Sequence, residues 1–150
     1  MFKRGVGTLI YHETKGILLI KRSQKANFQK NKWENVGGSV ENNETFFSAA
    51  KREVSEELGE DSLNHLEFEK TSLLHWIEKS INGENEWETM LFMAFADDYF
   101  EPKIPRKEFE YISDAKWFEK NNIPWMELTT YTKEDFEKLK LENKFPFNQT

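Results

Sequence analysis

The sequence predicts a domain that combines strands and helices, of the α/β or α+β class. Two observations carry this prediction: short apolar runs bounded by turn residues recur along most of the chain, and two segments carry apolar residues at helical spacing. At 150 residues the chain has the length of one ordinary domain, and nothing in it reads as a linker or a repeat. We therefore expect residues 1–150 to form a single domain.

The first part of the chain predicts a hairpin followed by a loop. Residues 5–11 (GVGTLIY) and 16–20 (GILLI) read as two strands joined by a polar turn. Residues 23–32 are polar and predict a surface loop. Residues 33–36 then lead to Gly37 and Gly38, an adjacent pair that marks a bend or a close approach to the backbone.

A helix is predicted next, with Thr45 as its N-cap, and it runs to about Leu58. Gly59 is a natural C-terminal stop. Four apolar residues recur at helical spacing within it: Phe47, Ala50, Val54 and Leu58. This stripe predicts that the helix packs on a sheet.

The second half predicts more strands and a final helix. Residues 66–77 and 86–95 read as two long strands, with Asn82 and Gly83 as a hairpin turn between them. Residues 97–107 contain two prolines and predict a loop, and residues 111–118 a short strand. Residues 132–141 predict a C-terminal helix with Thr132 as its N-cap.

Three carboxylates crowd the first of these helices. Glu53, Glu56 and Glu57 fall within about one helical turn, where like charges repel each other. A bound cation would convert this repulsion into attraction, and hard divalent cations such as Mg²⁺ take oxygen ligands of this kind. The alternative interpretation is a solvated acidic helix face.

The residues around these carboxylates favour the cation site. Residues 38–60, GSVENNETFFSAAKREVSEELGE, carry glycine, glutamate and an Arg-Glu-Val-x-Glu-Glu-x-Gly run at fixed spacing. This segment resembles the box of the Nudix hydrolases, and only Glu60 departs, since the family usually has an apolar residue there. The resemblance implies the Nudix fold, an α/β/α sandwich around a mixed sheet in which the box forms a loop–helix–loop.

The resemblance also implies an activity. Nudix enzymes use Mg²⁺ or Mn²⁺ to hydrolyse a diphosphate bond in a nucleoside diphosphate linked to another moiety. Similarity to MutT-type members points to a nucleoside triphosphate or an oxidised nucleotide as the small-molecule substrate. The alternatives are an ADP-ribose or other nucleotide-sugar pyrophosphatase, and a nucleotide-binding Nudix domain without catalysis.

Site residues follow from the match, position by position. The implied metal ligands are Glu53, Glu56, Glu57 and the main-chain carbonyl of Gly38. The implied catalytic residues are Glu53, Glu56, Glu57 and, as a base outside the box, Glu110, with Glu108 and Asp114 as alternatives. Arg22, Gly37 and Gly38 are expected to contact substrate, and Glu44 and Arg52 to form a structural ion pair.

Composition narrows the alternatives. The chain has no cysteine, which excludes disulfides, zinc–thiolate sites and the cysteine-dependent isopentenyl diphosphate isomerases of the same fold. A net charge of −6 weighs against RNA decapping and any other long nucleic-acid partner. No apolar run is long enough to cross a bilayer, so we expect a cytoplasmic protein without a membrane partner. A homodimer is open, since Nudix proteins often form one.

Overall fold

The structure, a computed structural model, describes residues 2–147. The two ends of the predicted 1–150 domain therefore lie outside the described residues. The strands are β1 (Phe2–His12), β2 (Gly16–Arg22), β3 (Trp33–Glu34), β4 (Val36–Ser39), β5 (Leu66–Phe68), β6 (Leu74–Lys79), β7 (Glu86–Ala96) and β8 (Ile112–Phe118). The α-helices are α1 (Phe46–Leu58) and α2 (Thr130–Leu141).

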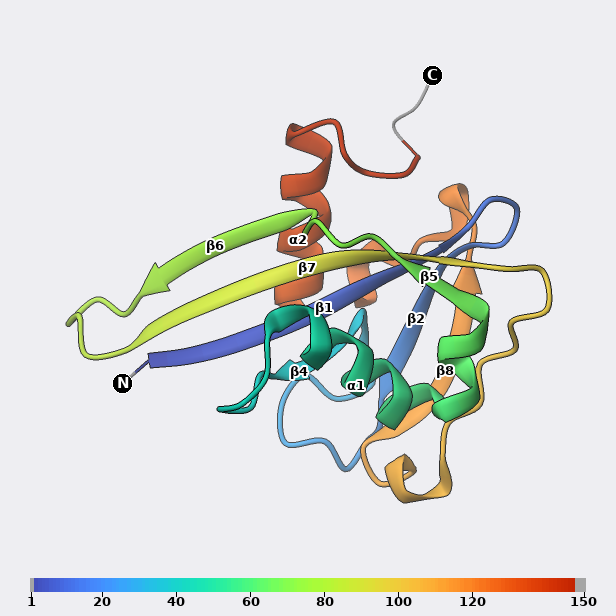
Figure 1. Cartoon of the computed structure of the whole chain (residues 1–150), viewed down its shortest axis with the longest axis horizontal. Helices are drawn as coiled ribbons and strands as arrows, with labels where there is room; N and C mark the ends of the chain where they lie inside the picture. The colour runs from blue at the N-terminus through green and yellow to red at the C-terminus, as the bar shows by residue number, and fades with distance from the viewer. Residues whose placement is uncertain (1, 148–150) are drawn as a thin grey trace.

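The strands form one mixed sheet around β1 and β7, which run parallel side by side (Figure 1). All other strand pairs are antiparallel: β1 pairs with β2 and β4, β2 with β3 and β8, and β7 with β5 and β6. The register places Gly7 opposite Gly37 and Val6 opposite Gly38. The glycine pair is thus held in β4, beside the central strand of the sheet.

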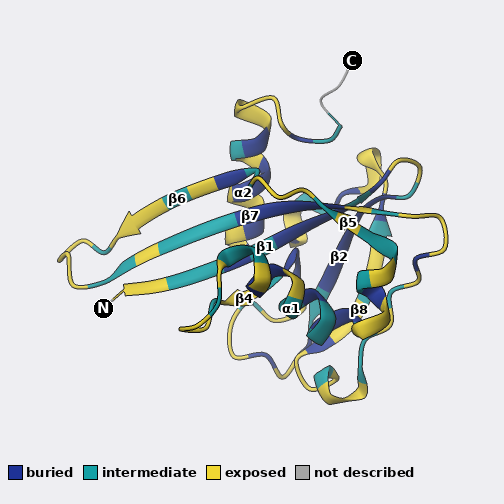
Figure 2. Cartoon of the chain, viewed as in Figure 1, coloured by how far each residue is buried: buried dark blue, intermediate teal, exposed yellow. Residues whose placement is uncertain are grey.

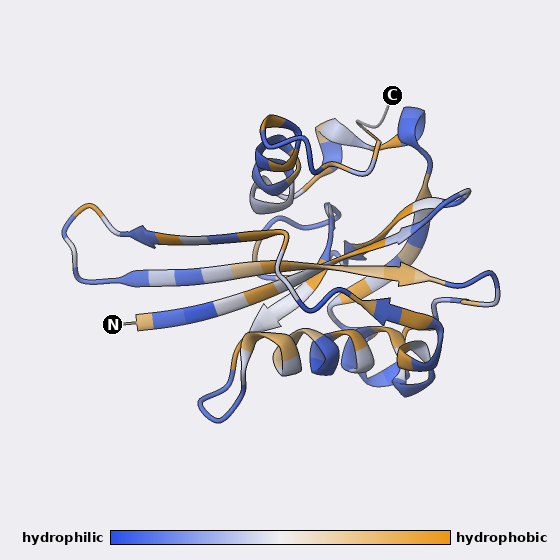
Figure 3. Ribbon diagram, turned by 45° about the horizontal axis from the view of Figure 1, so that its top comes forward, coloured by the Kyte–Doolittle hydropathy of each residue, from blue (hydrophilic) through white to orange (hydrophobic). Residues whose placement is uncertain are grey.

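The two α-helices cover opposite faces of the sheet, with α2 on one side and α1 on the other (Figure 3). Because side chains alternate along a strand, neighbouring residues of β1 serve the two faces. Leu9 packs in the core that contains Phe136 and Leu139 of α2, whereas Ile10 packs in the core that contains Val54 and Leu58 of α1. This arrangement confirms the α/β/α sandwich around a mixed sheet.

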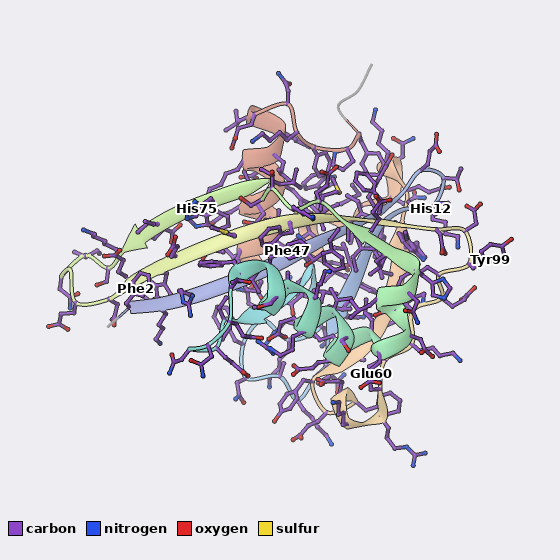
Figure 4. All side chains as sticks on the ribbon, viewed as in Figure 1. Phe2, His12, Phe47, Glu60, His75 and Tyr99 are labelled. Atoms are coloured by element: carbon purple, nitrogen blue, oxygen red, sulfur yellow. The ribbon has the colours of Figure 1, made fainter. Side chains whose placement is uncertain are left out.

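The buried core follows the middle of the sheet. Figure 2 shows buried residues where β1, β2 and β7 pass between the helices, and more exposed ones where β1, β6 and β7 extend beyond α1. At the start of α1, Phe47 packs edge-on against Phe92 of β7 and Phe68 of β5 (Figure 4). No helix within residues 2–147 is long and apolar enough to span a bilayer.

Both predicted hairpins are present. Tyr11 pairs with Ile17 across the first turn, and Gly83 lies at φ +73° in the second, where its N–H donates to the carbonyl of Ser80. The loop at 23–32 and the strand near 111–118 are also confirmed.

The predicted strand over 66–77 is wrong as a single element. The structure divides it into β5 and β6, which both pair with β7. Between them the backbone N–H of Glu69 donates to Met93 and that of Leu73 to Leu91, so five residues of this segment span only three of β7. The polar residues 69–72 therefore bulge out of the sheet, and the apolar run alone did not indicate this.

The predicted N-cap of the last helix is also wrong. The N-cap of α2 is Thr129, whose side chain makes no capping hydrogen bond, and Thr132 lies buried in the first turn. The hydroxyl of Thr132 instead accepts a hydrogen bond from the backbone N–H of Asn35 at 3.3 Å. A tertiary contact has taken the place of the local one.

Candidate active site

The box segment is fixed at both ends of α1. The hydroxyl of Thr45 accepts from the N–H of Ser48 at 3.0 Å, and the Ser48 hydroxyl accepts from the N–H of Thr45 at 3.1 Å, which makes a reciprocal cap. At the other end Gly59 has φ +92°, a conformation that favours glycine. Glu60 is exposed and extends from the helix exit (Figure 4), so its departure from the family pattern disturbs no packing.

Gly38 and Gly37 are required by two different contacts. A Cβ at Gly38 would overlap the carboxylate of Glu53, with the Glu53 Cδ only 2.6 Å away. A Cβ at Gly37 would instead collide with the backbone carbonyl of Val6 on the neighbouring strand. The absence of a side chain at Gly38 therefore lets a carboxylate of α1 lie directly against the β4 backbone.

Arg52 links the loop, the helix and β4. Its Nε and Nη2 bind the two oxygens of Glu44 at 2.6 and 2.9 Å. Its Nη1 donates to Glu53 at 3.0 Å and to Glu56 at 3.2 Å, and Nη2 also donates to the carbonyl of Ser39 at 2.8 Å. The structure thus places Arg52 and Glu44 in contact as the sequence predicts, and also joins Arg52 to two of the three clustered carboxylates.

Glu57 is the carboxylate that Arg52 does not contact. Its residue surface is only 8% exposed, and its Oε2 has no hydrogen-bond partner. Burial raises the pKa of Glu57 well above its usual range, and the neighbouring charge of Glu53 raises it further. The charges of Glu34 and Glu108 raise the pKa of Glu57 in the same direction.

Burial also affects Glu53, but Arg52 opposes its effect on the pKa of this carboxyl. Burial raises the pKa of the Glu53 carboxyl, while the charge and hydrogen bond of Arg52 lower it. A buried carboxylate with an unpaired oxygen is unfavourable unless a cation or a proton compensates it. The donor set, all carboxylate oxygens beside a strand backbone, is the type that Mg²⁺ and Mn²⁺ prefer.

The predicted ligands are not all aligned on one point. Within residues 2–147 no group of three histidine, aspartate or glutamate side chains converges closely enough to form a ready metal cage. Arg52 accounts for this, because its Nη1 engages Glu53 and Glu56 while Glu57 lies deeper. Glu57, which Arg52 does not contact, therefore fits a cation best, whereas Glu53 and Glu56 each give one oxygen to Arg52.

The candidates for an external base are separated by the structure. Glu110 is exposed, and its backbone carbonyl accepts from the hydroxyl of Ser23. Asp114 is exposed in β8 and accepts from the N–H of Ala115. Glu108 is the one of the three whose negative charge is among the causes that raise the pKa of Glu57.

Arg22 lies at the end of β2, in a polar chain centred on the buried Glu34. Its Nε donates to the carbonyl of Phe28 at 2.7 Å and its Nη1 to Glu34 at 3.2 Å. Glu34 also accepts a hydrogen bond from the hydroxyl of Tyr131 on α2. Burial raises the pKa of Glu34, and these two donors oppose the rise. These hydrogen bonds hold the guanidinium of Arg22 in one orientation.

A cavity of about 550 Å³ lies between the sheet and the start of α2; we call it the Asn35 cavity. Arg22, Gly37 and Gly38 line it, which brings together the three residues predicted to contact substrate. Asn35 and Asp135 line it as well. The cavity therefore reaches the glycine pair whose other side faces the carboxylates of α1.

Sequence reasoning missed four residues here: Glu34, Asn35, Tyr131 and Asp135. Asn35 and Asp135 carried a readable signal, because each is a polar residue within an apolar pattern. Asn35 stands one residue before buried Val36, and Asp135 stands on the α2 stripe that buries Phe136 and Leu139. Glu34 and Tyr131 carried no signal, since their contact joins residues 97 positions apart.

Comparison with known proteins finds a matching domain family and a related enzyme. The family model of the NUDIX domain matches residues 1–140. An RNA pyrophosphohydrolase of Pelagibacter ubique is 29% identical over 131 residues, which cover 81% of this chain and 78% of that protein.

Solved structures agree with the fold. A MutT NUDIX hydrolase from Burkholderia pseudomallei superposes with a TM-score of 0.70 at 27% identity, covering 93% of this chain and 98% of that one. A MutT protein from Methanosarcina mazei Go1 gives a TM-score of 0.71 at 23% identity, covering 95% and 96%, which supports the fold alone.

Proposed function

This chain belongs to the NUDIX domain family and is a hydrolase of pyrophosphate bonds, and from that premise we propose that it acts on a small nucleotide with the help of Mg²⁺ or Mn²⁺. The substrate we propose is a nucleoside triphosphate, oxidised forms included. We also propose that residues 1–150 form a single domain, since the family match spans all but the last ten.

The observation that carries the metal requirement is Glu57. An oxygen of a carboxylate that is 8% exposed has no partner, and the nearby charges of Glu53 and Glu34 repel it. Such a group is costly to bury, and a cation is the partner that would compensate it. We propose Glu53, Glu57 and the carbonyl of Gly38 as ligands, with Glu56 joining them or serving as a base.

A bound divalent ion supplies charge neutralisation at the phosphate oxygens and an activated water. The residues of this chain orient the proposed metal ligands and the charges that would face the substrate. Arg52 orients Glu53 and Glu56 through Nη1. Gly37 and Gly38 line the cavity, and Arg22, oriented by Glu34, presents a positive charge at the same cavity.

For the base outside the box, we propose Glu108 in preference to Glu110. A base must reach the reacting water, and Glu108 is the member of this acidic stretch whose charge acts on Glu57. Glu110 is exposed and has no such influence on Glu57. A homodimer stays a prediction.

The test is a substrate panel with products identified by mass. It contains the four nucleoside triphosphates, 8-oxo-dGTP, ADP-ribose and an RNA oligonucleotide with a 5′-triphosphate, each with Mg²⁺, with Mn²⁺ and with EDTA. We expect turnover of one or more triphosphates only when metal is present. Turnover in EDTA, or ADP-ribose as the sole substrate, would contradict the proposal.

The RNA arm tests a second candidate. The Pelagibacter ubique relative is named an RNA pyrophosphohydrolase, and its 29% identity favours a 5′-triphosphate RNA end as an alternative substrate. The net charge of −6 weighs against tight binding of the RNA phosphate backbone. A higher kcat/KM for the RNA than for the free triphosphates would establish this alternative.

A further inference from the structure

The hydroxyl of Tyr131 lies at one end of a chain of hydrogen bonds that leads to Arg22. It donates to Oε1 of Glu34, and Oε2 of the same carboxylate accepts from Nη1 of Arg22 at 3.2 Å. Glu34 is only 8% exposed, so its two oxygens depend on these partners within the protein. The carboxylate therefore links the first turn of α2 to the end of β2.

The protonation states suit this chain. Burial raises the pKa of Tyr131, and the negative charge of Glu34 raises it further, so the hydroxyl keeps its proton and donates. Burial also raises the pKa of Glu34, whereas the hydrogen bond from Tyr131 and the charge of Arg22 lower it. Both donors therefore favour the ionised carboxylate, which is the form that holds a guanidinium best.

The guanidinium of Arg22 is held at two of its three nitrogens. Nε donates to the carbonyl of Phe28 at 2.7 Å, and Nη1 donates to Glu34. Because the group is planar and rigid, these two contacts define its orientation. Nη2 makes no hydrogen bond within the described residues, and Arg22 lines the Asn35 cavity, so this nitrogen is free to bind an anionic group there.

The first turn of α2 also holds the loop that carries the Phe28 carbonyl. The backbone N–H of Thr130 donates to Oε1 of Gln29 at 2.7 Å. Since the N-cap residue, Thr129, makes no side-chain capping bond, Gln29 supplies an acceptor that the start of the helix lacks. Gln29 has φ +50°, an uncommon conformation for a residue other than glycine, and this contact supports it. Both contacts of Arg22 are therefore attached to the first turn of α2.

We propose that Tyr131 is a positioning residue for hydrolysis, which acts through Glu34 to orient the guanidinium of Arg22 toward the phosphates of the substrate. This inference rests on the proposed function, because it assigns the phosphates to the part of the Asn35 cavity that Arg22 lines. Loss of the Tyr131 hydroxyl leaves one oxygen of a buried carboxylate without a donor. The carboxylate then turns toward another partner or takes up a proton, and either change releases Nη1 of Arg22.

The first test is the steady-state kinetics of Tyr131→Phe with Mg²⁺ and the triphosphate that the wild type hydrolyses best. The variant keeps the aromatic ring, which is 42% exposed, and loses only the hydroxyl. We expect KM to rise about fivefold or more while kcat stays within about twofold, because a guanidinium that binds the phosphates before and during the reaction contributes uniform binding. An unchanged KM would overturn the inference, and so would a fall in kcat alone.

A double-mutant cycle separates positioning from a general structural effect. In the Arg22→Ala background, Tyr131→Phe should change KM by less than about twofold, because the group through which Tyr131 acts is absent. An equal change of KM in both backgrounds contradicts the inference. Tyr99→Phe is the matched control, since Tyr99 is 82% exposed and lies outside the Asn35 cavity, and it should match the wild type.

Solution NMR of the Arg22 Nε–H gives a measurement that does not depend on hydrolysis. In the wild type this N–H donates to Phe28, so it should exchange slowly with water, and its absence from Arg22→Ala assigns the signal. In Tyr131→Phe the exchange should become at least about fivefold faster, because the guanidinium loses its second anchor. An unchanged exchange rate would show that Tyr131 does not hold Arg22.

The outcomes separate this inference from the proposed function. Faster Arg22 exchange in Tyr131→Phe, in a protein that hydrolyses no nucleotide of the panel, supports the orientation of Arg22 by Tyr131 and refutes the proposed function. Hydrolysis of triphosphates with the same KM in the wild type and in Tyr131→Phe retains the proposed function and refutes the role of Tyr131.

Discussion

The guanidinium of Arg52 binds the carboxylate of Glu44 in a bidentate manner, with Nε at 2.6 Å from Oε2 and Nη2 at 2.9 Å from Oε1. The remaining nitrogen, Nη1, donates to Glu53 and Glu56. The pair that closes the loop onto the helix is therefore the same group that orients two proposed metal ligands. Arg52 therefore both holds the loop against the helix and orients two carboxylates of the proposed metal site.

Arg52→Ala should consequently lower both stability and activity. Losing charge-assisted hydrogen bonds at a partly buried site costs about 2 kcal/mol, which lowers the Tm by roughly 4–8 °C in a domain of this size. Hydrolysis should fall at least about tenfold, since Glu53 and Glu56 lose their orientation. Calorimetry and the triphosphate assay measure the two effects.

Arg106→Ala is the matched control, because Arg106 is exposed. It should leave both quantities unchanged. A Tm for Arg52→Ala equal to that of the control would refute the structural role, and full activity would refute the link to the ligands.

Local signals predicted the parts of this fold that depend on neighbouring residues. Thr45 and Gly59 bound α1 as expected, because an N-cap hydroxyl and a left-handed glycine act within one turn of the chain. Asn82 and Gly83 likewise marked their turn. The bulge after β5 escaped prediction because the hydrogen bonds that define it come from β7.

The candidate site likewise has a part that the sequence could predict and a part that it could not. The carboxylates of the box could be predicted because they lie on one helix, at fixed spacing. The contact between Asn35 and Thr132 could not, because 97 residues separate them and only the tertiary fold brings them together. The true N-cap of α2 escaped for this reason too, since the hydroxyl of Thr132 serves a strand junction instead of its own helix.

Glu57→Gln should separate stability from metal binding. Removing the charge relieves a buried, unpaired carboxylate, so the metal-free variant should be at least as stable as the wild type. The same change removes a proposed ligand, so Mn²⁺ should raise the Tm of the wild type but not of the variant. Hydrolysis should fall by about 100-fold or more.

The Tm measured with and without Mn²⁺ reports metal binding without depending on hydrolysis. Glu60→Gln, at an exposed position just beyond α1, is the control and should respond to Mn²⁺ like the wild type. An undiminished Mn²⁺ shift in Glu57→Gln would remove Glu57 from the ligand set.

The two glycines of β4 should respond differently to alanine. A Cβ at Gly38 meets the end of the Glu53 side chain, which can move, so the Tm should change by less than about 2 °C. The displaced carboxylate should nevertheless reduce hydrolysis at least about tenfold. A Cβ at Gly37 meets the backbone of Val6, which cannot move without disturbing the sheet.

Gly37→Ala should therefore lose about 1–3 kcal/mol of stability, the usual cost of overpacking. Each variant serves as the control for the other in paired Tm and activity measurements. Full activity in Gly38→Ala would show that Glu53 needs no contact with the β4 backbone.

Asp135 gives a prediction for pH. Burial raises its pKa to about 7 in the folded protein, from 3.8 as its ordinary value. Between these values the folded chain holds a proton that the unfolded chain has released, so rising pH favours unfolding. The contribution of this group to stability is complete below about pH 4, declines through pH 7 and is constant above it.

Asp135→Asn should remove that decline. Relative to the wild type, the variant should gain stability progressively from pH 4 to pH 8, by about 4 kcal/mol at most. Glu137→Gln, at an exposed position of α2 whose charge is not among those that shift the pKa of Asp135, should run parallel to the wild type across the range. Because Glu57, Glu53 and Glu34 also have raised pKa values, the difference between variant and wild type is the quantity to follow by urea unfolding. A constant difference from pH 4 to 8 would mean that Asp135 is ionised in the folded protein throughout.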